Sequence, residues 1–180
     1  DVTQGPDGRY YLYYCLDKRQ IVSVAVCDTP AGKYEFYGYV KHKDGTKLGE
    51  APGDEPQFDP AVLTEGDKTY LYGGFCLPND TTRTGTKAVV LDKDMLTIIE
   101  ESVLVLPSAP YAEDPEYKKH AFFEASSIRK VNDTYYFVYS SIVSTELCYA
   151  TSKHPTKDFV YRGTIVNNND IGIDTYKKAE

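Results

Sequence analysis

Two carboxylates stand out because each interrupts an apolar stretch of the chain. Asp59 lies in the sequence QFDPAVL and Glu124 lies in FFEASSI. Burying an ionised carboxylate costs several kcal/mol unless the group is paired or its pKa shifts, so a protein keeps such residues mainly for chemistry. A carboxyl group that stays protonated near neutral pH can donate a proton. The pattern therefore indicates acid–base chemistry, provided that the fold brings the two residues together.

The residues around Glu124 favour a protonated carboxyl group. Phe122 and Phe123 precede it and disfavour the ionised form, and a nearby Asp59 carboxylate would disfavour that form further by like-charge repulsion. The small residues that follow, Ser126 among them, leave room for a ligand to approach. A repeated architecture would bring residues so distant in sequence to equivalent positions, where they could face each other.

Such a repeat is visible as a polar turn followed by a tyrosine-rich strand. It occurs three times, as GPDGRYYLYY from Gly5, EGDKTYLYGG from Glu65 and KVNDTYYFVYSS from Lys130. The segments VAVCDTPAGKYEFYG from Val24 and CYATSKHPTKDFVYRG from Cys148 resemble each other at the same offset. Each unit therefore contains a β-hairpin, and its size is about that of one four-stranded propeller blade with its loops.

We predict an all-β fold of the β-propeller class. The chain would form one partial propeller domain, 1–180, with about three blades at 1–55, 56–118 and 119–180. The innermost strand of every blade runs beside the central channel, so acids at the starts of these strands would converge on one pocket. Asp1 also precedes such a strand, and we interpret it as an edge-protecting charge. A β-sandwich is the alternative fold, and LPSAPYAEDPEYKKH is interpreted as a long loop between strands.

Composition narrows the range of partners. The chain has 20 Lys and Arg against 27 Asp and Glu, a net charge of -7, which argues against a nucleic-acid surface. Its apolar runs are too short to span a membrane. The four cysteines lack C-x-x-C spacing, so we expect free thiols, which mildly favours a reducing compartment and hence the cytoplasm over secretion. The first residue is Asp and falls directly into strand-like sequence, so we expect the chain to be part of something longer.

The ordered motifs GRYYLYY, FDPAVL and FEASSI resemble the catalytic propeller of the family 43 glycoside hydrolases, which includes β-xylosidases and α-L-arabinofuranosidases. The resemblance spans essentially all 180 residues. It implies a five-bladed propeller in the complete fold and inverting hydrolysis of pentose-containing oligo- or polysaccharides. It also implies that Glu124 is the general acid, and that Asp59 orients Glu124 and raises its pKa.

Other expectations follow from the same resemblance. The general base would belong to a blade upstream of Asp1, so the segment alone should be inactive and the remaining blades should come from flanking sequence. No cofactor is required, although a structural calcium ion in the complete protein is compatible with the family. The histidines of this chain do not match the family's axial histidine, and we assign no metal ligand among His42, His120 and His154.

Three further residues are candidate substrate contacts: Phe75, Phe123 and Ser126. Phe75 could stack on a sugar ring, but ordinary packing within a blade explains it equally well. Two other functions stay open beside hydrolysis, namely a non-catalytic carbohydrate-binding propeller and a purely structural propeller.

Overall fold

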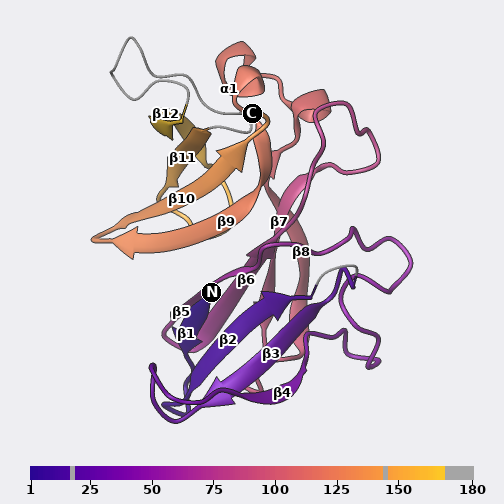
Figure 1. Ribbon diagram of the computed structural model, residues 1–180, viewed down its shortest axis with the longest axis vertical. Helices are drawn as coiled ribbons and strands as arrows, with labels where there is room; N and C mark the ends of the chain where they lie inside the picture. Colours follow the sequence, from indigo (N-terminus) through magenta and orange to yellow (C-terminus); the bar gives the residue numbers. More distant parts are fainter. Residues whose placement is uncertain (17–18, 144–145, 169–180) are drawn as a thin grey trace.

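The computed structural model describes residues 1–16, 19–143 and 146–168, which form three four-stranded antiparallel sheets (Figure 1). The first sheet consists of β1 (Val2–Gln4), β2 (Tyr10–Cys15), β3 (Val22–Cys27) and β4 (Glu35–Tyr39). The second consists of β5 (Ala61–Glu65), β6 (Lys68–Gly73), β7 (Gly85–Leu91) and β8 (Ile98–Pro107). The third consists of β9 (Phe122–Val131), β10 (Thr134–Ser141), β11 (Glu146–Ser152) and β12 (Val160–Asn167).

Each sheet is a meander in which strands adjacent in sequence are also adjacent in space. The predicted hairpins are confirmed, since β1 pairs with β2, β5 with β6 and β9 with β10. Two of these hairpins have two-residue turns that begin at Gly66 and Asn132, whose φ angles are 59° and 52°. Positive φ at this position matches the twist of a tight hairpin, which explains the residues that the sequence places there.

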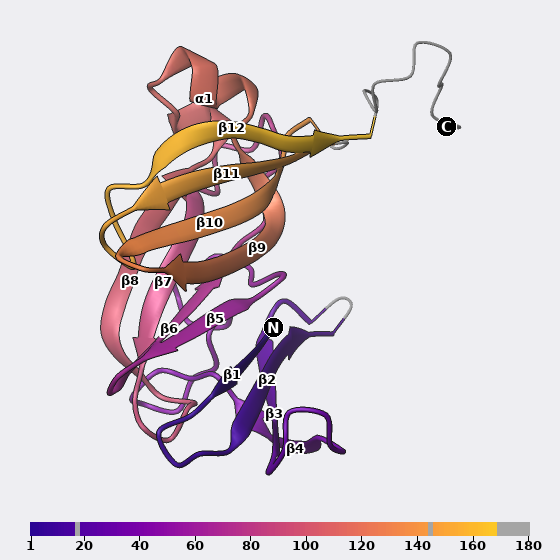
Figure 2. The same cartoon turned by 90° about the vertical axis from the view of Figure 1, so that its left-hand side faces the viewer.

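The three sheets pack face to face along the long axis of the molecule (Figure 2). Neighbouring residues of the middle sheet show how it is covered on both sides. Leu71 belongs to the core shared with the first sheet, and Tyr72 belongs to the core shared with the third. Because successive side chains of a strand point to opposite faces, the middle sheet contributes to two cores at once.

The innermost strands β1, β5 and β9 lie side by side, with β5 in contact with both others. Three four-stranded meanders arranged about their first strands are blades of a propeller, and the predicted fold class is confirmed. The β-sandwich alternative is wrong, because a sandwich has two facing sheets rather than three in succession.

The connection between β8 and β9 is more ordered than the expected loop. It contains a 3-10 turn, η1 (Ala109–Tyr111), and a short helix, α1 (Pro115–Lys119). The Asp114 side chain caps α1 by accepting hydrogen bonds from the backbone amides of Glu116 and Tyr117. The Tyr117 hydroxyl donates to the Pro107 carbonyl at 2.6 Å and so fixes the helix beside the sheet.

All four cysteines are free thiols, as expected. Only Cys76 and Cys148 are buried, whereas Cys15 and Cys27 are half-buried. Within the described ranges, no helix has the length and apolar character needed to cross a lipid bilayer.

Candidate active site

The fold brings Asp59 and Glu124 to the same place from two different blades. Asp59 lies two residues before β5, and Glu124 is the third residue of β9. The Asp59 Oδ2 atom accepts a hydrogen bond from the backbone amide of Ala125 at 3.1 Å. Asp59 therefore holds the backbone directly after Glu124.

The backbone of β9 is irregular on both sides of Glu124. Ser140 of β10 pairs with Glu124 while Val138 pairs with Ser127, so β9 carries one extra residue between these pairs, and a second shift follows at Ser141. Within the extra stretch Ala125 has a φ of 59°. Bulges of this kind redirect side chains and are common beside functional sites. A left-handed alanine costs about 1–2 kcal/mol, so its surroundings must hold it in place.

The electrostatics of the pair favour a protonated Glu124. Burial raises the pKa of Glu124, and the negative charge of Asp59 raises it further. The residue is half-buried, so a proton held there can still reach a ligand. These are the properties of a general acid.

A cavity of about 520 Å³ lies beside Asp59 and the backbone that follows Glu124, and we call it the hub cavity; Glu124 itself is not among its lining residues. Asp59, Ala125 and Ser126 are among its lining residues. Within the described part of the chain, the Ser126 hydroxyl oxygen is buried and has no hydrogen-bond partner. Buried hydroxyls are normally hydrogen-bonded, so this unpaired hydroxyl next to the hub cavity is unusual.

Asp1 also lines the hub cavity, where it connects the three blades. Its carboxylate accepts a hydrogen bond from the backbone amide of Val62 in β5 at 3.2 Å. It also forms an ion pair with Arg129 of β9 at 3.1 Å. The acid interpreted as an edge charge thus contacts both neighbouring blades.

The aromatic candidates lie next to the acid pair but form a group of their own. The ring of Phe75 lies between those of Phe58 and Phe123, with centroid distances of 5.7 and 5.1 Å. The guanidinium of Arg83 lies 4.9 Å from the Phe75 ring and also donates to the Phe75 carbonyl at 3.0 Å. Phe58, Phe75 and Arg83 help to line a separate cavity of about 290 Å³. Of the predicted site residues, Asp59 and Ser126 therefore line the hub cavity, whereas Phe75 lines the separate cavity.

Sequence reasoning did not identify the Ala125 amide or the blade-linking role of Asp1. The run of small residues after Glu124 was a signal that the backbone there is unusual, but the partner of the amide depends on blade packing. Among the described residues, one group could hold a metal ion, and it consists of His120, Glu146 and Cys148. None of these three residues lines the hub cavity.

Comparison with known proteins places this geometry in context. The sequence profile of the group described as "Glycosyl hydrolases family 43" matches residues 4–171. A xylosidase/arabinosidase of Thermoclostridium stercorarium is 67% identical over 180 residues, which is all of this chain and 38% of that protein.

Two solved structures are similar in fold and sequence. The RS223 β-xylosidase has a TM-score of 0.70 and 26% identity, over 93% of this chain and 56% of the other. A β-xylosidase/α-arabinofuranosidase from a compost microbial metagenome, described as a calcium-free form in complex with xylotriose, has a TM-score of 0.68 and 28% identity over the same shares. This chain thus spans about half the length of the two solved chains and 38% of the length of the Thermoclostridium stercorarium protein.

Proposed function

Because this chain belongs to glycosyl hydrolase family 43, we propose that it supplies the acid half of an active site that hydrolyses pentose-containing glycans. The family's solved structures are five-bladed propellers, and this chain corresponds to three of the blades. The observation that carries the proposal is that Asp59, which lines the hub cavity, bonds the backbone directly after Glu124 and acts electrostatically on the Glu124 carboxyl group.

In the proposed mechanism, Glu124 is the general acid of an inverting hydrolysis. Its carboxyl group protonates the glycosidic oxygen as the bond to the leaving group breaks, while a separate carboxylate about 6.5–9.5 Å away activates water on the opposite face of the sugar. We assign that base to a segment outside this chain, so the three blades alone should not turn over substrate. Burial and the Asp59 charge shift the pKa of Glu124 upward, toward the protonated form, and the Asp59 bond to the Ala125 amide fixes the neighbouring backbone.

The substrate contacts are proposed from the cavities. Ser126 would bond a sugar hydroxyl in the hub cavity, whereas Phe75 and Phe123 would form an apolar wall beside it. The xylose- and arabinose-directed names of the relatives favour pentosides such as xylo-oligosaccharides.

The described histidines do not fit an axial histidine at the hub. His42 pairs with Asp54, His120 with Glu146, and none of the described histidines lines the hub cavity. We therefore route no step of the reaction through a metal ion. A structural calcium ion in the complete protein stays a prediction.

The test is to compare wild-type full-length protein with Glu124→Gln on two classes of substrate. We expect kcat on xylobiose to fall by about 10²–10⁴-fold, because that leaving group needs a proton. Activity on nitrophenyl xyloside or arabinofuranoside should fall much less, because nitrophenolate leaves with little assistance. Glu101→Gln, at an exposed position of β8, is the matched control and should retain full activity.

Retained xylobiose activity in Glu124→Gln would contradict the assignment. A wild-type full-length protein that binds xylo-oligosaccharides but cleaves none of these substrates would instead support the carbohydrate-binding alternative.

A further inference from the structure

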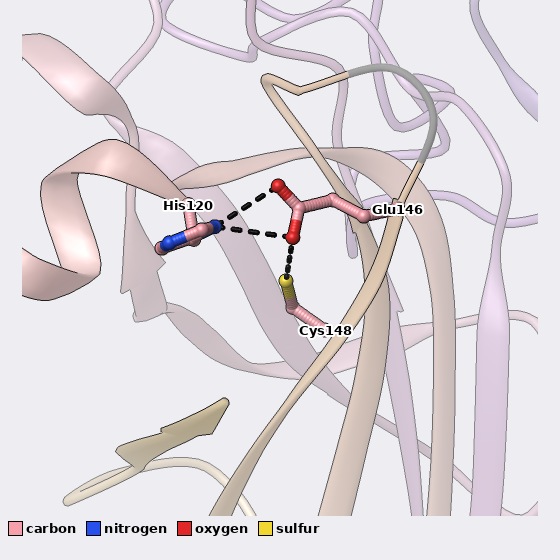
Figure 3. A group of neighbouring side chains, drawn as sticks. All are labelled: His120, Glu146 and Cys148. Carbon is pink, nitrogen blue, oxygen red and sulfur yellow. Dashed lines mark hydrogen bonds and ion pairs between the residues drawn. The ribbon is translucent and has the colours of Figure 1, made fainter. Parts of the chain in front are cut away.

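A second group of chemically active side chains, which shares no residue with the acid pair, lies at the start of β11 (Figure 3). It contains His120, which immediately follows α1, together with Glu146 and Cys148 of β11. Glu146 and Cys148 are two positions apart on one strand, so both side chains point to the same face and both are buried. Their ligand atoms and a ring nitrogen of His120 all lie within 4.8 Å of one another.

The contacts within the group are close. The Glu146 oxygens lie 2.9 and 3.1 Å from His120 Nδ1. Cys148 Sγ lies 3.5 Å from Glu146 Oε2, and the Thr164 hydroxyl donates to the same oxygen at 2.6 Å. Nitrogen, sulfur and carboxylate oxygen atoms therefore converge on one small volume.

We infer that His120, Glu146 and Cys148 form a binding site for a divalent transition-metal ion of the zinc type. Imidazole, thiolate and carboxylate are the three kinds of zinc ligand in proteins. On binding, the Cys148 thiol releases its proton to solvent and its sulfur bonds the ion. The thiolate and the Glu146 carboxylate then balance the two positive charges, while His120 binds as neutral imidazole. Water or the Thr164 hydroxyl would supply the fourth ligand of the ion.

The spacing suits tetrahedral coordination with small movements. Metal–ligand bonds of about 2.0–2.3 Å place neighbouring ligand atoms roughly 3.3–3.8 Å apart in a tetrahedron. The sulfur–oxygen distance of 3.5 Å already lies in this range. The distance from His120 Nδ1 to the same Glu146 oxygen, Oε2, is 3.1 Å and must open by a few tenths of an ångström, which rotation of the partly exposed His120 ring allows.

The surroundings of His120 resemble those of a metal-binding histidine. Its other ring nitrogen, Nε2, lies 3.9 Å from a carboxylate oxygen of Glu116. Tyr161 stacks on the imidazole with a centroid distance of 5.6 Å and an interplanar angle of 13°. Ligand histidines commonly have their second nitrogen oriented by a carboxylate, and removing that partner weakens metal binding by about 10–100-fold. His120 also keeps 24% of its side chain exposed, which gives an ion a route to the site.

The competing explanation is a purely structural hydrogen-bonded group. The ionised Glu146 carboxylate can accept bonds from His120, Cys148 and Thr164 without any ion. A thiolate–metal bond separates the two explanations, because the hydrogen-bonded group retains its thiol. This site is separate from the acid pair, so its failure leaves the proposed function standing.

The experiment is a Co²⁺ titration of the metal-stripped full-length protein, followed by the thiolate-to-cobalt charge-transfer absorption. We expect a band that saturates with one Co²⁺ at this site and is displaced by Zn²⁺. Cys148→Ser and His120→Asn should abolish that band, whereas Cys27→Ser, which changes a half-buried thiol in another sheet, should retain it. Far-ultraviolet circular dichroism checks that each variant is folded.

A graded variant sharpens the test. Glu116→Gln should weaken Co²⁺ binding by roughly two- to tenfold, less than loss of a hydrogen-bonded partner would, because its carboxylate lies 3.9 Å from Nε2. Glu113→Gln, at an exposed acid nearby, should leave Co²⁺ binding unchanged. Absence of a thiolate band in the wild type would overturn the inference, as would a band that survives in folded Cys148→Ser.

Discussion

At the scale of single residues, Asp59 acts on Glu124 in two ways. Its charge raises the pKa of Glu124, and its Oδ2 atom fixes the amide of Ala125. The sequence predicted the first effect, because both carboxylates interrupt apolar runs. It could not reveal the second, since a side chain that bonds a backbone amide leaves no pattern in the residue types.

Ser126 provides a residue-scale prediction. Its buried hydroxyl has no partner among the described residues, so Ser126→Ala should change the free energy of unfolding by less than about 0.5 kcal/mol. If the hydroxyl bonds substrate, KM for a pentoside should rise by roughly 2–12-fold, the equivalent of one hydrogen bond worth about 0.5–1.5 kcal/mol.

Denaturant unfolding and steady-state kinetics on the full-length protein measure the two effects, with exposed Ser102→Ala as control. A clear loss of stability with an unchanged KM would assign Ser126 a structural role instead.

At the scale of elements, the notable feature is the irregular part of β9, which surrounds Glu124. The three hairpins were predictable because they combine alternating strands with turn residues that favour positive φ. The bulge was not, because a left-handed Ala125 is intrinsically unfavourable and persists only through its contact with another blade. The contact of His120 with Glu146 of β11 also depends on tertiary packing, so the sequence did not suggest it. The cap of α1 was likewise not predicted.

Substitution of Ala125 tests this element. Ala125→Gly should be neutral or stabilise the protein by up to about 1 kcal/mol, because glycine adopts positive φ without a penalty. Ala125→Val should destabilise it and lower kcat, since a β-branched residue is least compatible with this conformation.

The control for the glycine variant is Ala88→Gly, at a buried position of β7 whose φ is not positive, which should cost about 1 kcal/mol. Unfolding in denaturant gives all three values. An equal cost for the two glycine variants would show that Ala125 is not strained.

At the scale of the whole molecule, the middle sheet joins the two cores. Phe137 of β10 is fully buried and its ring lies 5.8 Å from that of Tyr72 in β6. The propeller was predictable from the repeat and the resemblance. The propeller fold also implies that neighbouring blades share a core, because each blade can cover its apolar face only with a neighbouring blade.

Phe137→Ala should therefore affect two blades. We expect a loss of about 3–5 kcal/mol in the free energy of unfolding, and hydrogen exchange should accelerate in β6 as well as in β10. Tyr136→Ala, whose side chain points to the opposite face and is 37% exposed, should cost far less. Faster exchange confined to β9–β12 would show that the blades are energetically independent.

The central claim is that two distant carboxyl groups are coupled at the hub, and a direct titration of Glu124 tests it most sharply. In full-length protein labelled with ¹³C at glutamate carboxyl groups, Glu124→Gln identifies the resonance, which is then titrated in the wild type and in Asp59→Asn. Asparagine can still accept the Ala125 amide but lacks the charge. The account predicts a wild-type pKa above the usual value of about 4.3 and a lower pKa in Asp59→Asn, because removing a negative neighbour favours ionisation. An ordinary pKa in the wild type, or one unmoved by Asp59→Asn, would contradict it.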